Sequence, residues 1–119
     1  MLNVGLDLIE VGRIRRAVER HGARFLDRVY TERELAECDG DISRLATRWA
    51  AKEAAAKALG TGVGDCKWCE IEVVSDQRGR PHLELHGHAH VLAQSNGWTS
   101  WAVSLSHTGD HAAAVVVGQ

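Results

Sequence analysis

The apolar positions in the first part of the chain recur at two different periods. Residues 1–8 mix Leu, Val and Ile with Asn and Gly, which predicts a short first strand with Asp7 at its end. From Val11 to Val18 the apolar residues instead recur every three or four positions, which is the spacing of one helix face. Gly22 provides a stop for this helix, because glycine readily adopts the backbone conformation that ends helices.

Two further helices are predicted before the middle of the chain. Thr31 and Glu34 have the spacing of a capping box, so a short helix should begin there and break near residues 39–41. Residues 43–59 are mostly Ala, Leu, Lys and Glu, which are good helix formers. The glycine-rich segment 60–64 then supplies a stop and a flexible connector.

The second half of the chain changes to the alternating period of strands. Residues 71–76 alternate in the manner of a half-buried strand. The remaining predicted elements are a turn at 77–81, its hairpin partner at 82–85, a short helix at 89–94 and a second strand pair at 98–106 and 112–117. Because no repeat or linker divides the chain, we expect one α+β domain over residues 1–119.

Length and composition are those of an ordinary globular domain. Of the 119 residues, 45% are hydrophobic and 25% are charged, which excludes the disordered and fibrous classes. No apolar run approaches the roughly 20 residues that span a bilayer, and Asp7 comes too early for a signal peptide. Three cysteines argue against a complete disulfide framework. We therefore expect a cytoplasmic protein that does not associate with membranes.

Charge is distributed unevenly along the chain. The totals, 14 Lys and Arg against 16 Asp and Glu, give a net charge of −2, so we expect no nucleic-acid partner. Between residues 10 and 28, however, six arginines stand against three acidic residues. Arg13, Arg16 and Arg20 share one face of the predicted helix. A solvated face explains this stripe, but an acidic protein partner also suits it.

Two clusters contain residue types that bind transition metals. Cys66 and Cys69 have the CxxC spacing of half a zinc site or of a redox pair, but no second pair of ligands follows. The other cluster consists of His82, His86, His88 and His90. Alternate histidines on a strand could bind a metal, whereas a helix beginning at Gly87 would separate them. We favour solvated histidines and no metal in either cluster.

The alanine-rich helix contains the most informative charges. Glu53 and Lys57 are four residues apart and therefore face the same way. In isolation such an ion pair is a surface feature worth about 0.3–0.5 kcal/mol. Because alanines on either side allow the helix to pack closely, we infer that these charges are placed for a function.

Four segments together resemble the holo-acyl-carrier-protein synthases, which are the short AcpS-type phosphopantetheinyl transferases. The segments are residues 5–14 (GLDLIEVGRI), 48–54 (RWAAKEA), 57–62 (KALGTG) and 104–108 (SLSHT). The likeness extends over nearly the whole chain, and the length is also that of the family. Two positions depart from the pattern, since Gly12 is smaller than usual and Trp49 replaces a common Phe.

The resemblance implies a fold in which a small antiparallel sheet packs with a long alanine-rich helix and shorter helices. It also implies a Mg²⁺-dependent reaction, with Mn²⁺ as the alternative metal. In that reaction 4′-phosphopantetheine passes from coenzyme A to a serine of apo-acyl carrier protein, and adenosine 3′,5′-bisphosphate is released. The carrier protein would serve fatty acid or polyketide biosynthesis. Family members are homotrimers with active sites between subunits, so a homotrimer is expected.

The same resemblance assigns roles to individual residues. Asp7 and Glu53 match the metal ligands, and Lys57 matches a lysine near the pyrophosphate, so these three form the predicted catalytic group. Glu53, directly or through a metal-bound water, is also the candidate base for the carrier serine. The residues expected to bind coenzyme A are Arg48, Lys52, Lys57, Gly60, Ser106, His107 and Thr108. Arg13 matches a position that meets the carrier protein, and its neighbours Arg16 and Arg20 would extend that contact.

Two other functions remain open from the sequence. A non-catalytic trimeric module could bind a nucleotide or a carrier protein without turnover, although it would not need two acidic residues beside a lysine. A zinc-binding protein built on the histidines is the other alternative. Magnesium-dependent activity would distinguish the transferase from both of them.

Overall fold

The structure of the chain, a computed structural model, describes residues 1–60 and 66–119. Apart from Gly60, the predicted connector at 60–64 therefore lies outside the described residues. The elements in chain order are β1 (Asn3–Glu10), α1 (Val11–His21), α2 (Ala23–Val29), α3 (Glu32–Cys38), α4 (Ile42–Ala58), the 3-10 helix η2 (Trp68–Glu70), β2 (Ile71–Ser75), β3 (Pro81–Leu85), α5 (Gly87–Ser95), β4 (Trp101–His107) and β5 (His111–Gly118).

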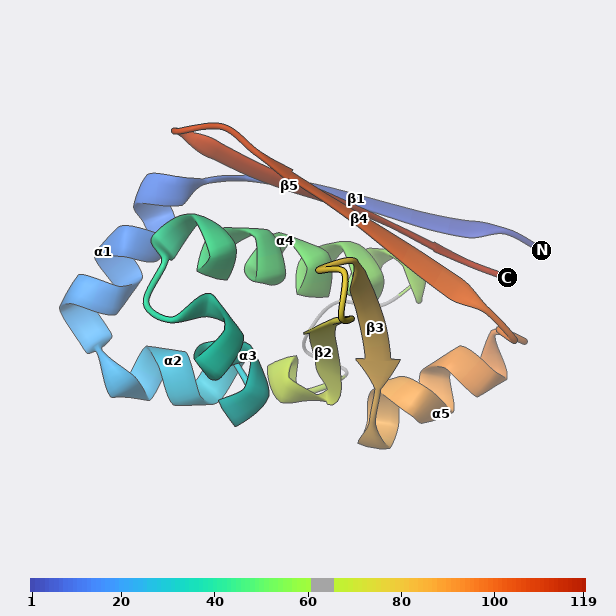
Figure 1. The fold of residues 1–119 in the computed structure, drawn as a ribbon. Coiled ribbons are helices and arrows are strands. Elements are labelled where there is room, and N and C mark those ends of the chain that lie inside the picture. Colours follow the sequence, from blue (N-terminus) through green and yellow to red (C-terminus); the bar gives the residue numbers. More distant parts are fainter. Residues whose placement is uncertain (61–65) are drawn as a thin grey trace.

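Helix α4 is the centre of the molecule, and the other elements surround it (Figure 1). An antiparallel sheet with the order β1-β5-β4 lies along one side of α4. The β2–β3 hairpin and α5 lie on the other side, and α1, α2 and α3 gather around one end. This is the α+β architecture expected from the resemblance. Within the described part of the chain, no helix is both long enough and apolar enough to cross a bilayer.

Close contact between β1 and α4 depends on small residues. Ala50, Ala51, Ala54 and Ala55 of α4 are completely buried. Gly5 of β1 lies directly against this helix, where an added Cβ would overlap the carbonyl oxygen of Ala54. A strand carrying larger side chains here could not approach the helix backbone. The contact fixes the position of the residues that follow Gly5 on β1.

The outer face of the sheet is apolar along β1 and β5. Along β1 the odd-numbered residues face α4, whereas Val4, Leu6 and Leu8 point away from it and are 65%, 64% and 67% exposed. The strand pairing places Val115 and Val117 of β5 beside them on the same face. Large apolar patches of this kind mark interaction surfaces in soluble proteins.

Most of the predicted elements are confirmed. Gly22 ends α1 with a φ of 54°, and the capping box begins α3. In that box the amide of Glu34 donates to Thr31 Oγ1 at 3.1 Å, and the amide of Thr31 donates to Glu34 Oε1 at 2.9 Å. The first strand differs from the prediction because β1 continues to Glu10, so Asp7 lies inside the strand instead of at its end.

The burial of β2 also differs from the prediction. A half-buried strand was expected, but Ile71, Glu72, Val73 and Val74 are all buried. The reason is that both α4 and α3 pack against this strand. Glu34 of α3 accepts a hydrogen bond from the amide of Val73, and Thr31, which caps α3, donates one to Glu72. An alternating pattern cannot reveal this second covering layer, because Glu72 looks like a solvent-facing residue in the sequence.

Candidate active site

Asp7, Glu53 and Lys57 meet where β1 lies against α4. Lys57 Nζ donates to Asp7 Oδ1 at 3.1 Å and to the main-chain carbonyl of Leu6 at 3.0 Å. The Asp7 side chain is 16% exposed and that of Lys57 is 53% exposed, so the pair opens to solvent on the lysine side. Glu53 lies one turn before Lys57 on the same helix face. The structure thus brings the three predicted catalytic residues into one group.

The carboxylates of this group influence each other. Burial raises the pKa of Glu53, the negative charge of Asp7 raises it further, and the ammonium of Lys57 opposes both effects. The net result is a pKa above the ordinary glutamate value, which makes this carboxylate a stronger base than an ordinary glutamate. Two neighbouring carboxylates also form an all-oxygen donor set of the kind that Mg²⁺ prefers. The residues present therefore fit a Mg²⁺ ion.

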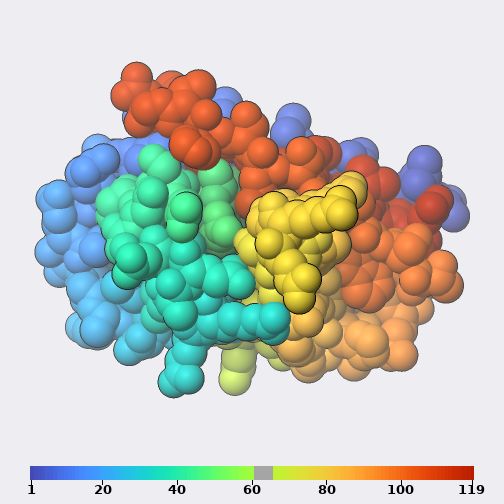
Figure 2. All heavy atoms as spheres, in the orientation of Figure 1, coloured from blue at the N-terminus to red at the C-terminus, as the bar shows by residue number. Residues whose placement is uncertain are grey.

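Arg48 lines two adjoining cavities on a different side of α4. One, of about 480 Å³, is also lined by Ser75 and His107. The other, of about 430 Å³, is also lined by Arg80 and Ser104. Figure 2 shows the region where the green α4, the yellow hairpin turn and the orange-red β4 meet. Predicted ligand-binding residues from α4 and β4 are brought together here.

The guanidinium of Arg48 is only partly satisfied by the protein. One terminal nitrogen donates to Thr47 Oγ1 at 3.1 Å, and the other donates to Ser75 Oγ at 3.4 Å. Among the described residues, its Nε is buried without a hydrogen-bond partner. A buried donor without a hydrogen-bond partner is unfavourable. This N–H is therefore well suited to donate a hydrogen bond to an anionic ligand such as a phosphate.

The catalytic group and the Arg48 cavities lie at opposite edges of the sheet. Asp7 belongs to β1 and His107 ends β4, and these strands flank β5 in the order β1-β5-β4. Neither cavity is lined by Asp7, Glu53 or Lys57. Among the residues that the structure describes, these two cavities therefore do not reach the predicted catalytic group.

Three other predicted ligand-binding residues are exposed. Ser106 lies on the outer face of β4, and Gly60 follows α4 with a φ of 81°. Thr108 lies in the β4–β5 turn, where its hydroxyl accepts hydrogen bonds from the amides of Asp110 and His111 at 3.3 and 3.1 Å. The hydroxyl of Thr108 therefore also shapes the turn that follows His107.

Lys52 does not fit its predicted role in binding coenzyme A. Its side chain is completely buried, and its Nζ donates to Glu34 Oε1 at 2.8 Å, to the carbonyl of Ile71 at 2.6 Å and to the carbonyl of Trp68 at 3.1 Å. These contacts use all three donors of the ammonium. Burial lowers the pKa of Lys52, whereas the charge of Glu34 opposes this shift. The structure gives Lys52 a role in holding α4 against β2.

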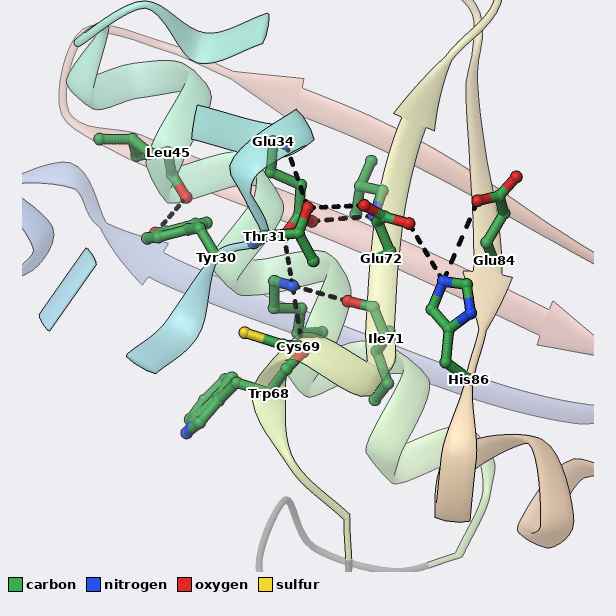
Figure 3. Close-up of polar contacts among 12 residues, drawn as sticks. Tyr30, Thr31, Glu34, Leu45, Trp68, Cys69, Ile71, Glu72, Glu84 and His86 are labelled. Atoms are coloured by element: carbon green, nitrogen blue, oxygen red, sulfur yellow. Dashed lines mark hydrogen bonds and ion pairs between the residues drawn. The ribbon is translucent and has the colours of Figure 1, made fainter. Parts of the chain in front are cut away.

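Glu34 is an important residue that the sequence identified only as part of a capping box. Its Oε1 accepts from Lys52 and from the amide of Thr31, and its Oε2 accepts from the amide of Val73 at 2.8 Å. Figure 3 shows this carboxylate between α3 and β2. The available signal was Lys52 itself, because a lysine among buried alanines requires an acidic partner.

The arginine stripe of α1 forms one surface, as predicted. Arg13, Arg16 and Arg20 line a single hollow of about 650 Å³, together with Glu19 and His21. The spacing of the arginines thus does place them on one face of the helix.

The structure gives the following positions for the cysteines and histidines of the two clusters. Cys66 is buried, and the thiol of Cys69 contacts the main-chain carbonyls of Asp27 and Arg28. His82, His86, His88 and His90 are all exposed, in agreement with the prediction. Within residues 1–60 and 66–119, one group of at least three possible metal ligands lies close together, and it consists of Glu72, Glu84 and His86.

Comparisons with known proteins show the family of this chain. The family model described as the 4′-phosphopantetheinyl transferase superfamily matches residues 3–116. A holo-[acyl-carrier-protein] synthase from Herpetosiphon aurantiacus is 52% identical over 99% of this chain and 98% of its own length. One from Moorella thermoacetica is 46% identical over 98% of this chain and 93% of its own length.

Solved structures of holo-[acyl-carrier-protein] synthases have a similar fold. The Helicobacter pylori holo-[acyl-carrier-protein] synthase in complex with coenzyme A is 28% identical and superposes with a TM-score of 0.89, covering 98% of this chain and 99% of that one. A Chronobacterium ammoniagenes ACPS–CoA complex is 31% identical with a TM-score of 0.89, covering 100% of this chain and 97% of that one.

Proposed function

The chain belongs to the holo-[acyl-carrier-protein] synthases of the 4′-phosphopantetheinyl transferase superfamily, and we propose that it transfers 4′-phosphopantetheine from coenzyme A to a serine of apo-acyl carrier protein. The products are holo-acyl carrier protein and adenosine 3′,5′-bisphosphate. The observation that carries the proposal is the grouping of Asp7, Glu53 and Lys57. The reaction serves fatty acid biosynthesis, and a polyketide carrier protein is the second candidate substrate.

Coenzyme A binding is supported by two independent features. The Helicobacter pylori relative was solved in complex with coenzyme A. In this chain, Arg48 lines a cavity together with His107, and its buried Nε has no hydrogen-bond partner among the described residues. We assign the phosphates of the nucleotide to this region, with Arg80 contributing a second positive charge from the adjoining cavity.

Asp7 and Glu53 would hold the Mg²⁺ ion that the reaction requires, and Mn²⁺ is the alternative. When bound, the ion supplies positive charge that offsets the negative charge of the pyrophosphate. The neighbouring Lys57 is already placed beside Asp7, so its ammonium adds a second positive charge at the same point.

The transfer itself is a displacement at phosphorus. The carrier serine oxygen forms a bond to the phosphorus that bears the pantetheine arm, and the P–O bond to the adenosine 3′,5′-bisphosphate half breaks. Glu53 accepts the serine proton, directly or through a water molecule. Lys57 stabilises the charge that develops on the departing phosphate.

A homotrimer would complete the site. In one chain the catalytic group and the Arg48 cavities occupy opposite edges of the sheet. The apolar outer face that includes Val4, Leu6 and Leu8 gives neighbouring chains a surface on which to associate. Such an association would place the β1 edge of one subunit beside the β4 edge of the next and so form the active site between subunits.

The arginine stripe is the proposed docking surface for the acidic carrier protein. Reversing the charge of Arg13, Arg16 and Arg20 should slow association and flatten its dependence on salt, because long-range attraction is lost. Arg15→Glu is the matched control, since Arg15 belongs to α1 but does not line the hollow. An unchanged salt dependence in the triple variant would mean that the stripe is only a solvated face.

The decisive experiment weighs the carrier protein. The purified chain is mixed with coenzyme A, Mg²⁺ and apo-acyl carrier protein, and intact-mass spectrometry should show a gain of one phosphopantetheine that a chelator abolishes. Glu53→Gln should keep the fold and coenzyme A binding but lose the transfer. Coenzyme A binding without any transfer to several carrier proteins would favour the alternative of a non-catalytic binding module.

A further inference from the structure

Outside the proposed active site, the β2–β3 hairpin brings two carboxylates and an imidazole together. Glu72 of β2 is directly opposite Glu84 of β3 in the strand register. His86 follows Glu84 by two residues and so projects on the same side. Its Nε2 lies 3.0 Å from Glu72 Oε1 and 4.0 Å from Glu84 Oε2. Figure 3 shows the imidazole between the two carboxylates.

A further positive charge between these two carboxylates would be favourable. Like charges that face each other across two strands destabilise a hairpin. Here one of the two, Glu72, also has a side chain that is only 11% exposed, and an ionised group loses hydration when it is buried. The imidazole compensates this charge only when it is protonated.

We propose that Glu72, Glu84 and His86 form a binding site for a Zn²⁺ ion. The three ligand atoms lie within 4.8 Å of one another. A zinc ion with ligands at about 2.1 Å requires them to be about 3.0–3.4 Å apart, so small side-chain rotations are sufficient. An imidazole nitrogen beside two carboxylate oxygens favours Zn²⁺ over Mg²⁺, which distinguishes this site from Asp7 and Glu53.

The surroundings already orient one ligand as metal sites require. Thr31 Oγ1 donates to Glu72 Oε2 at 2.6 Å, which leaves Oε1 directed toward His86. Hydrogen bonds from neighbouring groups to the other oxygen of a carboxylate ligand hold metal ligands in position. Because Thr31 also caps α3, the bound ion would join both strands of the hairpin to the start of that helix.

Among the described residues, Arg33 is the only arginine or lysine that forms an ion pair with Glu84, and it would compete with a metal ion for that carboxylate. Its terminal nitrogen lies 3.5 Å from Glu84 Oε2, and the two side chains are 55% and 47% exposed. An exposed pair of this length contributes little, so the zinc ion can displace it. Removing the arginine should therefore improve zinc binding.

The test is a calorimetric titration of metal-free protein, without an affinity tag, with Zn²⁺. Excess Mg²⁺ is present throughout, so that the all-oxygen pair Asp7 and Glu53 is occupied. The native chain should bind one equivalent, and His86→Gln should weaken binding at least tenfold. His90→Gln removes another exposed histidine of the same region and should leave the affinity unchanged. Arg33→Gln should tighten binding several-fold.

A second variant, Glu84→Gln, tests the same zinc site independently of His86. Glu84→Gln alters an exposed side chain, so it provides a second test if His86→Gln does not fold. Equal zinc affinity in the native chain, His86→Gln and Glu84→Gln would overturn the proposal, as would the absence of a one-equivalent transition. Phosphopantetheine transfer with Mg²⁺ should persist in both variants, so this result is independent of the proposed function.

Discussion

Replacing Lys52 with methionine would leave Glu34 as a buried carboxylate without its counter-ion. Methionine retains much of the length of the lysine side chain, so the main loss is the ammonium and its three hydrogen bonds. Both side chains of the pair are completely buried, which prevents water from replacing those bonds. The variant therefore tests whether the charge of Lys52 serves the fold.

The expected loss is large. Removing one partner of a buried ion pair costs about 3–5 kcal/mol, because the other charge stays desolvated. Chains of this size are stable by only about 5–15 kcal/mol, so Lys52→Met should remove a substantial fraction of that margin. For a domain of this length the same loss corresponds to a decrease in Tm of about 10–20 °C.

Urea unfolding followed by circular dichroism measures the effect, with all variants compared at one protein concentration. Lys57→Met is the matched control on the same helix. Its side chain is 53% exposed, so its stability should change by less than about 1 kcal/mol although transfer falls. Adding Glu34→Gln to Lys52→Met removes the isolated charge and should recover stability by at least about 1 kcal/mol.

One result would refute this reasoning. If Lys52→Met unfolded within about 1 kcal/mol of the native chain while its KM for coenzyme A rose, the ammonium would be a substrate contact after all. The buried ion pair would then be an incidental feature of the fold.

Three other predictions follow from the packing and the site. Gly5→Ala should lower the free energy of unfolding by at least about 2 kcal/mol, because the new Cβ would overlap the carbonyl of Ala54; unchanged urea unfolding would show that strand and helix separate easily. Leu6→Asp should convert the proposed trimer to monomers in sedimentation equilibrium, and a persistent trimer would place the interface elsewhere. The raised pKa of Glu53 predicts that kcat/KM falls as the pH decreases through that pKa, because the base becomes protonated. The same acidic limb in Glu53→Gln would identify a different base.

The sequence by itself determined much of the local structure and indicated the proposed catalytic group. Apolar spacing and the capping box formed by Thr31 and Glu34 depend on neighbours within a few residues, and the structure confirms these elements. Glu53 and Lys57 could be paired because residues four apart on a helix share a face. The resemblance supplied their partner Asp7, which the structure places beside Lys57.

Only the tertiary structure decided which charges are buried. Lys52 and Glu53 are adjacent in the sequence, yet the ammonium of Lys52 is completely buried beside Glu34 while the carboxylate of Glu53 interacts with Asp7. The period of a helix shows which residues share one face of it, but not which other elements pack against that face.

The separation of the predicted site residues was also decided by tertiary structure. The order β1-β5-β4 places Asp7 and His107 at opposite edges of one sheet. Strand register likewise brings Glu72, Glu84 and His86 together. The physical reason is that strand pairing joins residues far apart in the chain, and local patterns of hydrophobic and polar residues do not specify which strands pair.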